Sequence, residues 1–395
     1  MHKKTVRDVD TGGKRVLVRV DFNVPMDRDG RIEDDTRIRA CLPTISYLID
    51  HKARVILCSH LGRPHGSVDE HLRLAPVAGH LSELLRKPVE PLREAVGPGV
   101  VRSVAGMRDG EVVLLENLRF YPGEEENDPR FARELSLLAD LFVNDAFGAC
   151  HREHASIVGL AHYLPCVAGL LMEKEIVQLG SLLETPSRPF AAIMGGAKVG
   201  DKMEVLEHIL PRVDLVLMGG GMAATFLKES GYEVGVSDVE PDTMELAGRI
   251  LREAPARGVR ILLPVDVVVA GELDAGAESR VVTVGQIPAA CRIADIGPLT
   301  REEFTRELEQ CRTVVWNGPM GVFEIPQFSA GTSSVASALA GLSATTVIGG
   351  GSTAEAVTGL GLAGRMTHVS TGGGATLRFL AGRTLPGIEV LADRE

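Results

Sequence analysis

Short apolar runs rich in β-branched residues alternate with segments of helical periodicity along the first half of the chain. Each run has the length of one buried strand, and the segments between them repeat their apolar positions as an amphipathic helix does. The expected strands are Arg15–Val20, Arg54–Cys58, Val112–Leu115 and Leu141–Asn144, and the expected helices are Arg37–Lys52, Leu74–Arg86 and Arg130–Ala139. This alternation predicts an α/β fold with a largely parallel sheet.

A second series of the same kind follows a long helical segment. Gly169–Leu183 predicts one long helix, and the two prolines of TPSRP (185–189) end it. The strands expected beyond it are Phe190–Met194, Leu215–Met218, Arg260–Leu263, Thr313–Trp316, Thr345–Ile348 and His368–Ser370. We therefore predict two doubly wound parallel-sheet domains joined by a long helix, over residues 1–170 and 171–380, with a tail (381–395) that packs back on one of them.

Charge and cysteine usage argue against several classes of partner. The formal net charge over 395 residues is −11, which disfavours nucleic acid or an anionic membrane as the main partner. The six cysteines are scattered without CxxC spacing, so neither a zinc site nor a disulfide framework is expected. The charged start MHKKTVRDVD lacks the apolar stretch of a signal peptide, and no apolar run is long enough to span a bilayer. A cytoplasmic location is the simplest prediction.

Three glycine-rich turns connect predicted strands to helices in the second half. They are LVLMGGGMAATF (215–226), TVIGGGSTAEAV (346–357) and HVSTGGGATLRF (368–379). Glycines at the carboxyl end of a parallel strand let backbone N–H groups approach a phosphate, and the next helix adds the positive end of its dipole. One such turn is often only a steric device. Three together, with lysines nearby, favour a nucleotide.

The same turns also fit a dinucleotide-binding fingerprint. The matches to G-x-G-x-x-A are Gly219, Gly221 and Ala224, and Gly349, Gly351 and Ala354. That fingerprint also requires an acidic residue about 20 positions later, at the end of a second strand. The segment VSDVEPDT at that place is typical of a loop, and no Walker A motif is present. A nicotinamide-dependent dehydrogenase is therefore the weaker alternative.

Charged side chains gather at the expected strand ends. In GGAKVGDK, Lys198 and Lys202 fall on one face near a helix N-terminus, where the helix dipole disfavours cations unless an anion binds. A solvated lysine pair is the alternative. In the first half the polar residues that follow strands or begin helices are Asp21, Asn23, Arg37, His60, Arg63, Asn117, Arg119, Asp145, His151, Arg152 and His154. Arginine binds phosphate and carboxylate in a bidentate fork, so one basic crevice is predicted in an acidic protein, although any single arginine could be a surface ion pair.

Together these motifs identify a resemblance. The ordered segments RVDFNVP, DDTRIRACLPTI, SHLGRP, LAPVA, LLENLRF, NDAFG, GGAKV, GGGMA, LPVDVVVA, DIGP, WNGPMGVFE, STGGGAT and LPGIEVL resemble phosphoglycerate kinase along nearly the whole chain. The resemblance implies two domains that face each other across a cleft. The first would bind 3-phosphoglycerate or 1,3-bisphosphoglycerate and the second Mg²⁺ with ADP or ATP. It also implies that the tail returns to the first domain and that the protein is a monomer.

The resemblance assigns residues by motif. Acid binding falls to Asp21, Asn23, Arg37, His60, Arg63, Arg119 and Arg152, and nucleotide binding to Lys198, Lys202, Gly220, Asn317, Glu324, Gly350, Gly351, Ser352 and Thr353. The segments PVDVVVA, DIGP and WNGPMGVFE suit an adenine slot, with Glu324 as an acceptor for ribose hydroxyls. Arg37, Lys202 and the Gly351 amide are expected at the transferring phosphoryl group. Both nucleophiles are ionised at neutral pH, so no general base is needed, and domain closure would complete the site.

One departure concerns the metal. The family turn is GGGDT or GGGDS, whose acidic residue helps to hold the magnesium nucleotide, whereas this chain has Ser352 there. Smaller departures are Glu153 and Arg378. Ser352 could ligate Mg²⁺ weakly through its hydroxyl, or it could be only a helix N-cap, since Ser352-Thr-Ala-Glu355 fits a capping box. Ser352 also leaves a second alternative open, a catalytically weakened paralogue that acts as a ligand-binding regulator.

Overall fold

Two compact units make up the computed structural model, which describes residues 2–394. Unit 1 contains the residues up to Val177 and those from Thr384 onward, and unit 2 is Gln178–Arg383. The border between the units falls inside helix α6 (Leu170–Glu184), which is the long helix that the sequence predicts. The division by function at 170/171 and 380/381 stays a prediction.

Unit 1 is built on a six-stranded parallel sheet in the order β3-β4-β2-β1-β5-β6. Its strands are β1 (Arg15–Arg19), β2 (Arg54–Cys58), β3 (Val89–Pro91), β4 (Val112–Leu114), β5 (Leu141–Asn144) and β6 (Cys166–Ala168). In β1, Val16, Leu17 and Val18 are all fully buried. A strand covered on both faces reads as a continuous apolar run rather than an alternating one. That is why β1, β2, β4 and β5 could be predicted from sequence.

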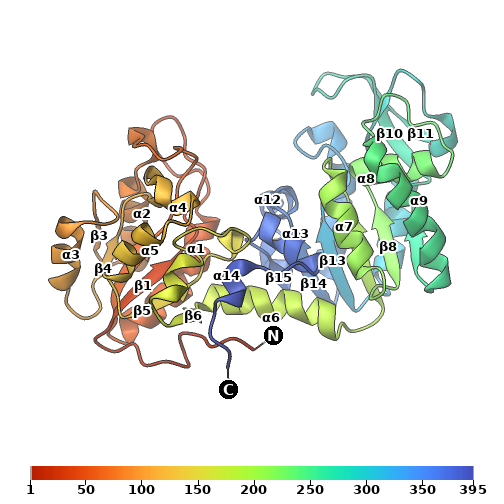
Figure 1. Cartoon of the computed structure of the whole chain (residues 1–395). Coiled ribbons are helices and arrows are strands. Elements are labelled where there is room, and N and C mark those ends of the chain that lie inside the picture. The colour runs from red at the N-terminus through yellow and green to blue at the C-terminus, as the bar shows by residue number, and fades with distance from the viewer. Residues whose placement is uncertain (1, 395) are drawn as a thin grey trace. The chain divides into compact units, whose positions relative to one another are not determined.

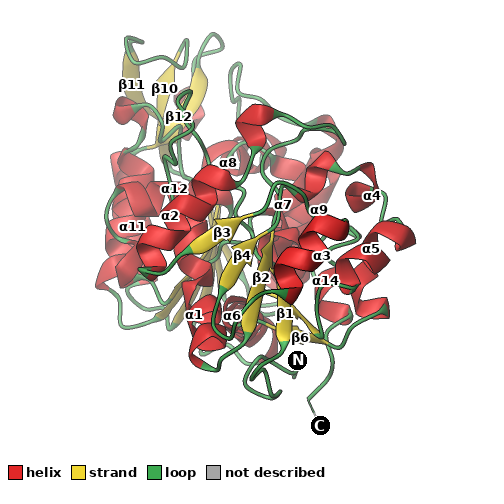
Figure 2. Ribbon diagram, turned by 90° about the vertical axis from the view of Figure 1, so that its left-hand side faces the viewer, coloured by secondary structure: helices red, strands yellow, loops and turns green. Residues whose placement is uncertain are grey.

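Helices cover both faces of the unit 1 sheet. They are α1 (Thr36–Asp50), α2 (Ala75–Leu85), α3 (Pro98–Ala105), α4 (Pro122–Glu125), α5 (Pro129–Ser136) and, near the chain's end, α14 (Pro386–Glu389). Figure 2 shows the strands between α1 and α2 on one side and α3 and α5 on the other. The core beneath α1 and α2 is aliphatic, with Ile38, Ile45 and Leu81 packed on the sheet.

Unit 2 contains a second six-stranded parallel sheet, in the order β15-β14-β13-β7-β8-β9. Its strands are β7 (Phe190–Met194), β8 (Leu215–Met218), β9 (Arg260–Leu262), β13 (Thr313–Asn317), β14 (Thr345–Gly349) and β15 (His368–Val369). Its helices are α7 (Val199–Ile209), α8 (Gly220–Glu229), α9 (Pro241–Ala256), α10 (Pro298–Leu308), α11 (Ala330–Gly341), α12 (Gly351–Gly359) and α13 (Gly374–Leu380). The prediction of two parallel-sheet α/β domains is confirmed.

A small antiparallel sheet in unit 2 was not predicted. It has the order β11-β10-β12 and consists of β10 (Asp266–Ala270), β11 (Ser279–Thr283) and β12 (Arg292–Ile296). Strand β11 is largely exposed, so it lacks the buried apolar run on which the sequence prediction depends. Short 3₁₀ helices complete the chain at Glu70–Leu72, Leu118–Phe120, Phe147–Ala149, Gly159–His162, Val284–Gln286, Pro326–Phe328 and Ala363–Arg365. Within residues 2–394 no helix has the length and apolar character needed to cross a membrane.

The last residues of the chain pack on unit 1. The Lys4 amide donates to the Ala392 carbonyl at 2.8 Å, and the Gly387 amide donates to the Cys150 carbonyl at 3.0 Å. The Asn144 side-chain amide, at the end of β5, donates to the Gly387 carbonyl at 3.1 Å. A Cβ at Gly387 would lie 2.9 Å from Cys150 Cα, so only glycine allows this approach. Figure 1 shows α14 close to α1 and β6 of unit 1.

Candidate functional sites in the two units

The loop after β1 uses its polar side chains to fix neighbouring loops of unit 1. Asp21 is buried and its Oδ2 accepts a hydrogen bond from Arg37 Nη1 at 2.9 Å. Asn23 Oδ1 accepts from the Gly62 amide at 2.9 Å, which ties the β1 loop to the β2 loop. Asp21 therefore orients the Arg37 guanidinium, whose side chain keeps 37% of its surface exposed and can still meet a ligand.

Arg119 is held at the end of β4 by its surroundings. The Asn117 side chain accepts from the Arg119 amide at 3.1 Å and donates to the Leu61 carbonyl at 2.8 Å. Arg119 Nη1 donates to the Gly62 carbonyl at 2.8 Å, and its Nε lies 3.3 Å from Glu125 Oε1 without a well-aligned hydrogen bond. Burial lowers the pKa of Arg119, with a counteracting contribution from Glu125. The guanidinium is thus a preorganised, partly desolvated cation.

Two histidines of unit 1, His60 and His154, have lowered pKa values. His60 Nδ1 lies 3.1 Å from Arg19 Nη2, and an arginine can only donate, so this nitrogen accepts. Burial, followed by Arg19, Arg119, Arg152 and Arg37, holds the pKa of His60 well below its ordinary value. Burial, followed by Arg19, Arg119, Arg152 and His151, lowers the pKa of His154 to about 3. His60 and His154 are therefore uncharged at neutral pH, and arginines supply positive charge around them.

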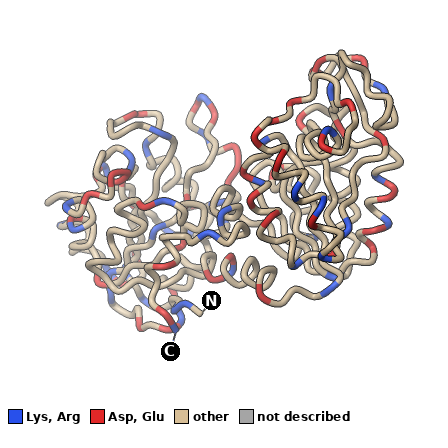
Figure 3. The backbone as a smooth tube through the Cα atoms, turned by 45° about the vertical axis from the view of Figure 1, so that its right-hand side comes forward, with Lys and Arg blue, Asp and Glu red and all other residues tan. Residues whose placement is uncertain are grey.

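Two of the predicted arginines differ in their placement. Arg152 is half-buried and is among the cations that lower the pKa of His60. Arg63 is exposed and is not among the named causes of that pKa shift. The structure groups Arg37, Arg119 and Arg152 around His60 and leaves Arg63 at the surface. Figure 3 shows acidic and basic positions interspersed over both units, so the basic character of this cluster is local.

Sequence reasoning missed a buried network beneath the cluster. Arg19, the last residue of β1, is only 1% exposed, and its Nε donates to Ser156 Oγ at 2.8 Å. Ser156 Oγ in turn donates to Oε1 of the fully buried Glu124 at 2.6 Å. Burial raises the pKa of Glu124, while Arg19 acts to lower it. The available signal was an arginine inside the apolar run RVLVRV, where a lone buried charge requires a partner.

The glycine turns of unit 2 line a cavity of about 670 Å³. The predicted residues on its wall are Lys198, Lys202, Gly220, Asn317, Glu324, Gly350, Gly351, Ser352 and Thr353. Each nucleotide-binding residue that the sequence predicts therefore lies on one cavity.

Glycine occurs on the wall of this cavity for two different reasons. The Gly220 amide donates to the Met320 carbonyl at 2.8 Å, and a Cβ at Gly220 would lie 2.6 Å from the Gly196 nitrogen. This turn is glycine-rich because three backbone segments touch there. Gly351, by contrast, has open space where a Cβ would stand. It lies in the first turn of α12, whose first amides have no partner within the helix and can donate to an anion.

Ser352 is not the N-cap of α12. The N-cap is Gly350, whose φ of 89° only glycine adopts easily, and Ser352 is the second helical residue with an exposed side chain. The predicted capping box with Glu355 is therefore wrong. Thr353 is the residue with a structural role, because its buried Oγ1 accepts from the Gly318 amide at 2.7 Å. Asn317 is also buried beside Gly350, and its Nδ2 has no hydrogen-bond partner.

Lys198, the N-cap of α7, and Lys202, in its first turn, have different environments. Lys198 is exposed, whereas Lys202 is buried, and its Nζ donates to the Lys198 carbonyl at 3.3 Å. Burial lowers the pKa of Lys202, while Asp201 acts in the opposite direction. Glu240, which sequence reasoning missed, caps α7 by accepting from the Val199 and Gly200 amides at 3.3 and 3.2 Å. The solvated-pair alternative holds for Lys198 but not for Lys202.

The cavity offers few protein ligands for a metal. Among residues 2–394 there is no group of three or more His, Cys, Asp or Glu side chains arranged to hold a metal ion. The acidic side chains on the cavity wall are Asp201, Asp238 and Glu324. Mg²⁺ in such sites keeps several waters and takes most other ligands from substrate phosphates. The donor set therefore suits a magnesium ion that arrives with a nucleotide better than a resident one.

Comparisons with known proteins cover the whole chain. The family model described as "Phosphoglycerate kinase" matches residues 6–383. Curated phosphoglycerate kinases of Pelotomaculum thermopropionicum and Moorella thermoacetica are 58% and 54% identical over 394 residues, with 100% of both chains covered. The solved structure of phosphoglycerate kinase from Coxiella burnetii has a TM-score of 0.87 at 40% identity, covering 99% of each chain. The enzyme from Pyrococcus horikoshii gives the same TM-score at 37% identity, covering 99% of this chain and 98% of its own.

Proposed function

The chain belongs to the phosphoglycerate kinase family, and we propose that its two units divide the substrates of one phosphoryl transfer between them. The reaction is the reversible transfer between 1,3-bisphosphoglycerate and ADP, which gives 3-phosphoglycerate and ATP. The observation that carries this function is the match to phosphoglycerate kinases from end to end at 53–58% identity. The comparisons support neither the dehydrogenase nor the weakened regulator.

The arginine cluster of unit 1 is the proposed acid site. Arg119 and Arg152 would hold the phosphate that is not transferred, with Arg63 at the exposed edge. Arg37 would face the transferring group, because Asp21 orients its guanidinium and leaves one side open. Asp21 and Asn23 would act mainly through the loops that they fix, and His60 would contribute an uncharged ring. A guanidinium held in place before binding loses little entropy when it meets a phosphate.

The cavity of unit 2 is the proposed nucleotide site. The first-turn amides of α12, including that of Gly351, would donate to phosphate oxygens, and Lys202 would neutralise the charge that develops on the transferring group. Mg²⁺ bound with the nucleotide supplies further neutralisation of phosphate charge. The Ser352 hydroxyl and the Asp201 carboxylate, which are both on the cavity wall, would be the protein oxygens that support it. Because both nucleophiles are already ionised, catalysis consists of positioning and charge stabilisation.

Several finer points remain predictions from the composition and the family resemblance. These are the cytoplasmic location, the monomeric state, the role of magnesium, and the absence of nucleic-acid and membrane partners. They can be tested by size-exclusion chromatography, by metal titration and by fractionation of cells.

Substituting Arg119 tests the assignment of the acid site. Arg119→Ala should weaken 3-phosphoglycerate binding at least about tenfold, because a hydrogen bond to a charged group is worth about 1.5–3 kcal/mol. ADP binding, measured on the same sample by calorimetry, should stay within about twofold. Arg108→Ala is the matched control, since Arg108 is an exposed arginine of unit 1 that pairs with Glu111. A parallel loss of both affinities in Arg119→Ala would contradict the division of substrates.

Domain closure is the second expectation from the proposed division of substrates between the two units. Neither unit holds both ligand sets, so transfer requires the two sites to meet and to exclude water, which would hydrolyse the acyl phosphate. The radius of gyration from small-angle scattering should be smaller with 3-phosphoglycerate and a non-hydrolysable ATP analogue together than with either alone. Identical values in the four ligand states would count against closure.

Ser352 tests how the protein supports magnesium. Ser352→Asp should lower the Mg²⁺ concentration for half-maximal rate several-fold and raise turnover, because a carboxylate neutralises the ion and a hydroxyl does not. Asp in the first turn of α12 also suits the helix dipole, so stability should not fall. Ser352→Asn is the matched neutral control. Equal Mg²⁺ dependence in the Asp and Asn variants would show that charge at this position is irrelevant.

A further inference from the structure

Glu125 places a carboxylate beside the buried arginine of the cluster in unit 1. Its Oε1 lies 3.3 Å from Arg119 Nε, and this nitrogen is buried without a hydrogen-bond partner. The Arg119 side chain is only 4% exposed, whereas the Glu125 side chain is 41% exposed. The guanidinium is therefore the fixed member of this pair, and the carboxylate is the member that solvent can reach.

Arg119 does not depend on Glu125 for its position. Its Nη1 donates to the Gly62 carbonyl at 2.8 Å, and its backbone amide donates to Asn117 Oδ1 at 3.1 Å. These two contacts hold the guanidinium and the backbone of the residue. Glu125 adds a negative charge without a well-aligned hydrogen bond. Removal of that charge should therefore leave the guanidinium in place.

The backbone of α4 keeps the Glu125 carboxylate near Arg119. Glu125 is the last residue of α4, and its neighbour Glu124 is fully buried. The Glu124 carboxylate accepts from the Ser156 amide at 3.0 Å and from the Ser156 hydroxyl at 2.6 Å. Burial lowers the pKa of Arg119, and Glu125 makes the largest opposing contribution. The empty cluster thus contains its own counterion for Arg119.

A phosphate that binds Arg119 has to compete with this counterion. A phosphate monoester is largely a dianion at neutral pH, and like charges a few ångströms apart repel more strongly in a partly desolvated site than in water. Glu125 can avoid that repulsion by turning into solvent. Because exposed ion pairs contribute little to stability, hydration of the carboxylate largely replaces the contact that it loses.

We propose that Glu125 is a displaceable counterion that sets the affinity of the phosphate subsite. It neutralises Arg119 in the empty enzyme, gives way to the phosphate that is not transferred, and returns as the acid leaves. The proposal rests on the acid site proposed above. Tighter binding of the acid in the ground state would slow its release without helping the transfer step, so a built-in competitor favours turnover.

The experiment measures binding to the full-length enzyme and to Glu125→Gln, which keeps the side-chain shape and removes the charge. The dissociation constants of 3-phosphoglycerate and ADP are measured by calorimetry, and that of inorganic phosphate by competition against 3-phosphoglycerate. Glu125→Gln should bind 3-phosphoglycerate and inorganic phosphate at least about threefold more tightly, with ADP unchanged, because only the first two ligands meet Arg119. The dissociation rate of 3-phosphoglycerate should fall by a similar factor.

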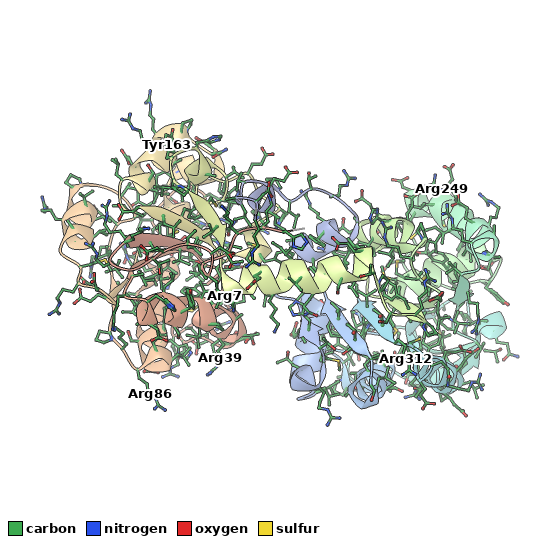
Figure 4. All side chains as sticks on the ribbon, turned by 90° about the horizontal axis from the view of Figure 1, so that it is seen from below. Arg7, Arg39, Arg86, Tyr163, Arg249 and Arg312 are labelled. Carbon is green, nitrogen blue, oxygen red and sulfur yellow. The ribbon has the colours of Figure 1, made fainter. Side chains whose placement is uncertain are left out.

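Three further variants separate a local effect from a general change of net charge. Glu126→Gln removes the same charge from the next residue, which is also exposed, and should change none of the constants. Glu207→Gln removes a carboxylate from an exposed ion pair with Arg249, which lies at the periphery of unit 2 (Figure 4), and should also have no effect. Glu125→Asp retains the charge and should bind 3-phosphoglycerate less tightly than Glu125→Gln does.

The other outcomes overturn the proposal. An unchanged affinity for 3-phosphoglycerate in Glu125→Gln, or a gain that Glu126→Gln shares, would mean that Glu125 does not compete for Arg119. Weaker binding in Glu125→Gln, with a lower melting temperature, would mean that the carboxylate supports the arginine. Failure of the acid site itself has a different signature, which is unchanged 3-phosphoglycerate binding in Arg119→Ala.

Discussion

Replacing Lys202 by Met should lower kcat by about 10²- to 10³-fold, the usual cost of losing one preorganised group that stabilises transition-state charge. Lys202 is buried at the first turn of α7, where both desolvation and the helix dipole oppose a cation. A Cβ on Gly196 would lie 2.8 Å from its Nζ, so the ammonium lies directly over the glycine turn of β7. Burial makes this position costly for a cation in the free protein, and a bound anion would offset that cost.

The stability of the Lys202→Met variant distinguishes function from structure. A residue kept for the fold would lower the melting temperature when replaced, whereas removal of a strained buried cation should leave it unchanged or raise it. Binding of 3-phosphoglycerate, which belongs to unit 1, should also be unchanged. Lys228→Met is the matched control, because Lys228 is an exposed lysine of unit 2 outside the cavity. A fall in stability that parallels the loss of activity would contradict the assignment.

The pH profile gives an independent measurement. Burial lowers the pKa of Lys202 from 10.5, so the ammonium loses its proton at a lower pH than an exposed lysine does. The catalytically useful form is the charged one, present below that pKa and lost above it. The alkaline limb of kcat/KM, which reports the free enzyme, should therefore begin below pH 10.5 in the wild type and be absent in the residual activity of Lys202→Met.

The success of sequence reasoning depended on whether a local pattern determined the structure. Strands β2, β5, β7 and β8 have the predicted bounds because each is a buried apolar run between turns. Strand β3 was missed because only Val89 of its three residues is buried. The cavity residues were predicted because parallel strands bring their carboxyl ends to one edge.

Other errors arose where a tertiary contact, rather than a local sequence pattern, determines the structure. Ser352 fits a capping box in sequence, but the chain turns at Gly350, so the helix begins two residues earlier than that pattern implies. Glu240 caps α7 from a loop about 40 residues away, and no periodicity connects the two segments.

Disrupting the buried network of Arg19, Ser156 and Glu124 should have the second large effect, which is a loss of stability in unit 1. The network combines buried charges with buried hydrogen bonds. Arg19→Met should destabilise unit 1 by about 3–5 kcal/mol, the cost of leaving a buried charge without its partner. The substitution keeps a similar chain length, but Glu124 then stays fully buried with only Ser156 as a side-chain donor. It also removes the donor to His60 Nδ1 and so loosens the ring at the centre of the cluster.

A double-mutant cycle tests whether Arg19 and Glu124 act as a pair. Glu124→Gln removes the charge that Arg19 balances, so the double variant should be more stable than the sum of the two single losses by at least about 1 kcal/mol. Hydrogen exchange of peptides from β1 and β5 reports on unit 1. The single tryptophan, Trp316, lies in unit 2 and provides an internal reference, since its fluorescence transition in urea should not move. Additive losses would mean that the two buried charges are stabilised independently, Arg19 by Val20, His60 and Ser156, and Glu124 by Ser156. Arg19 would then support His60 and the arginine cluster rather than Glu124.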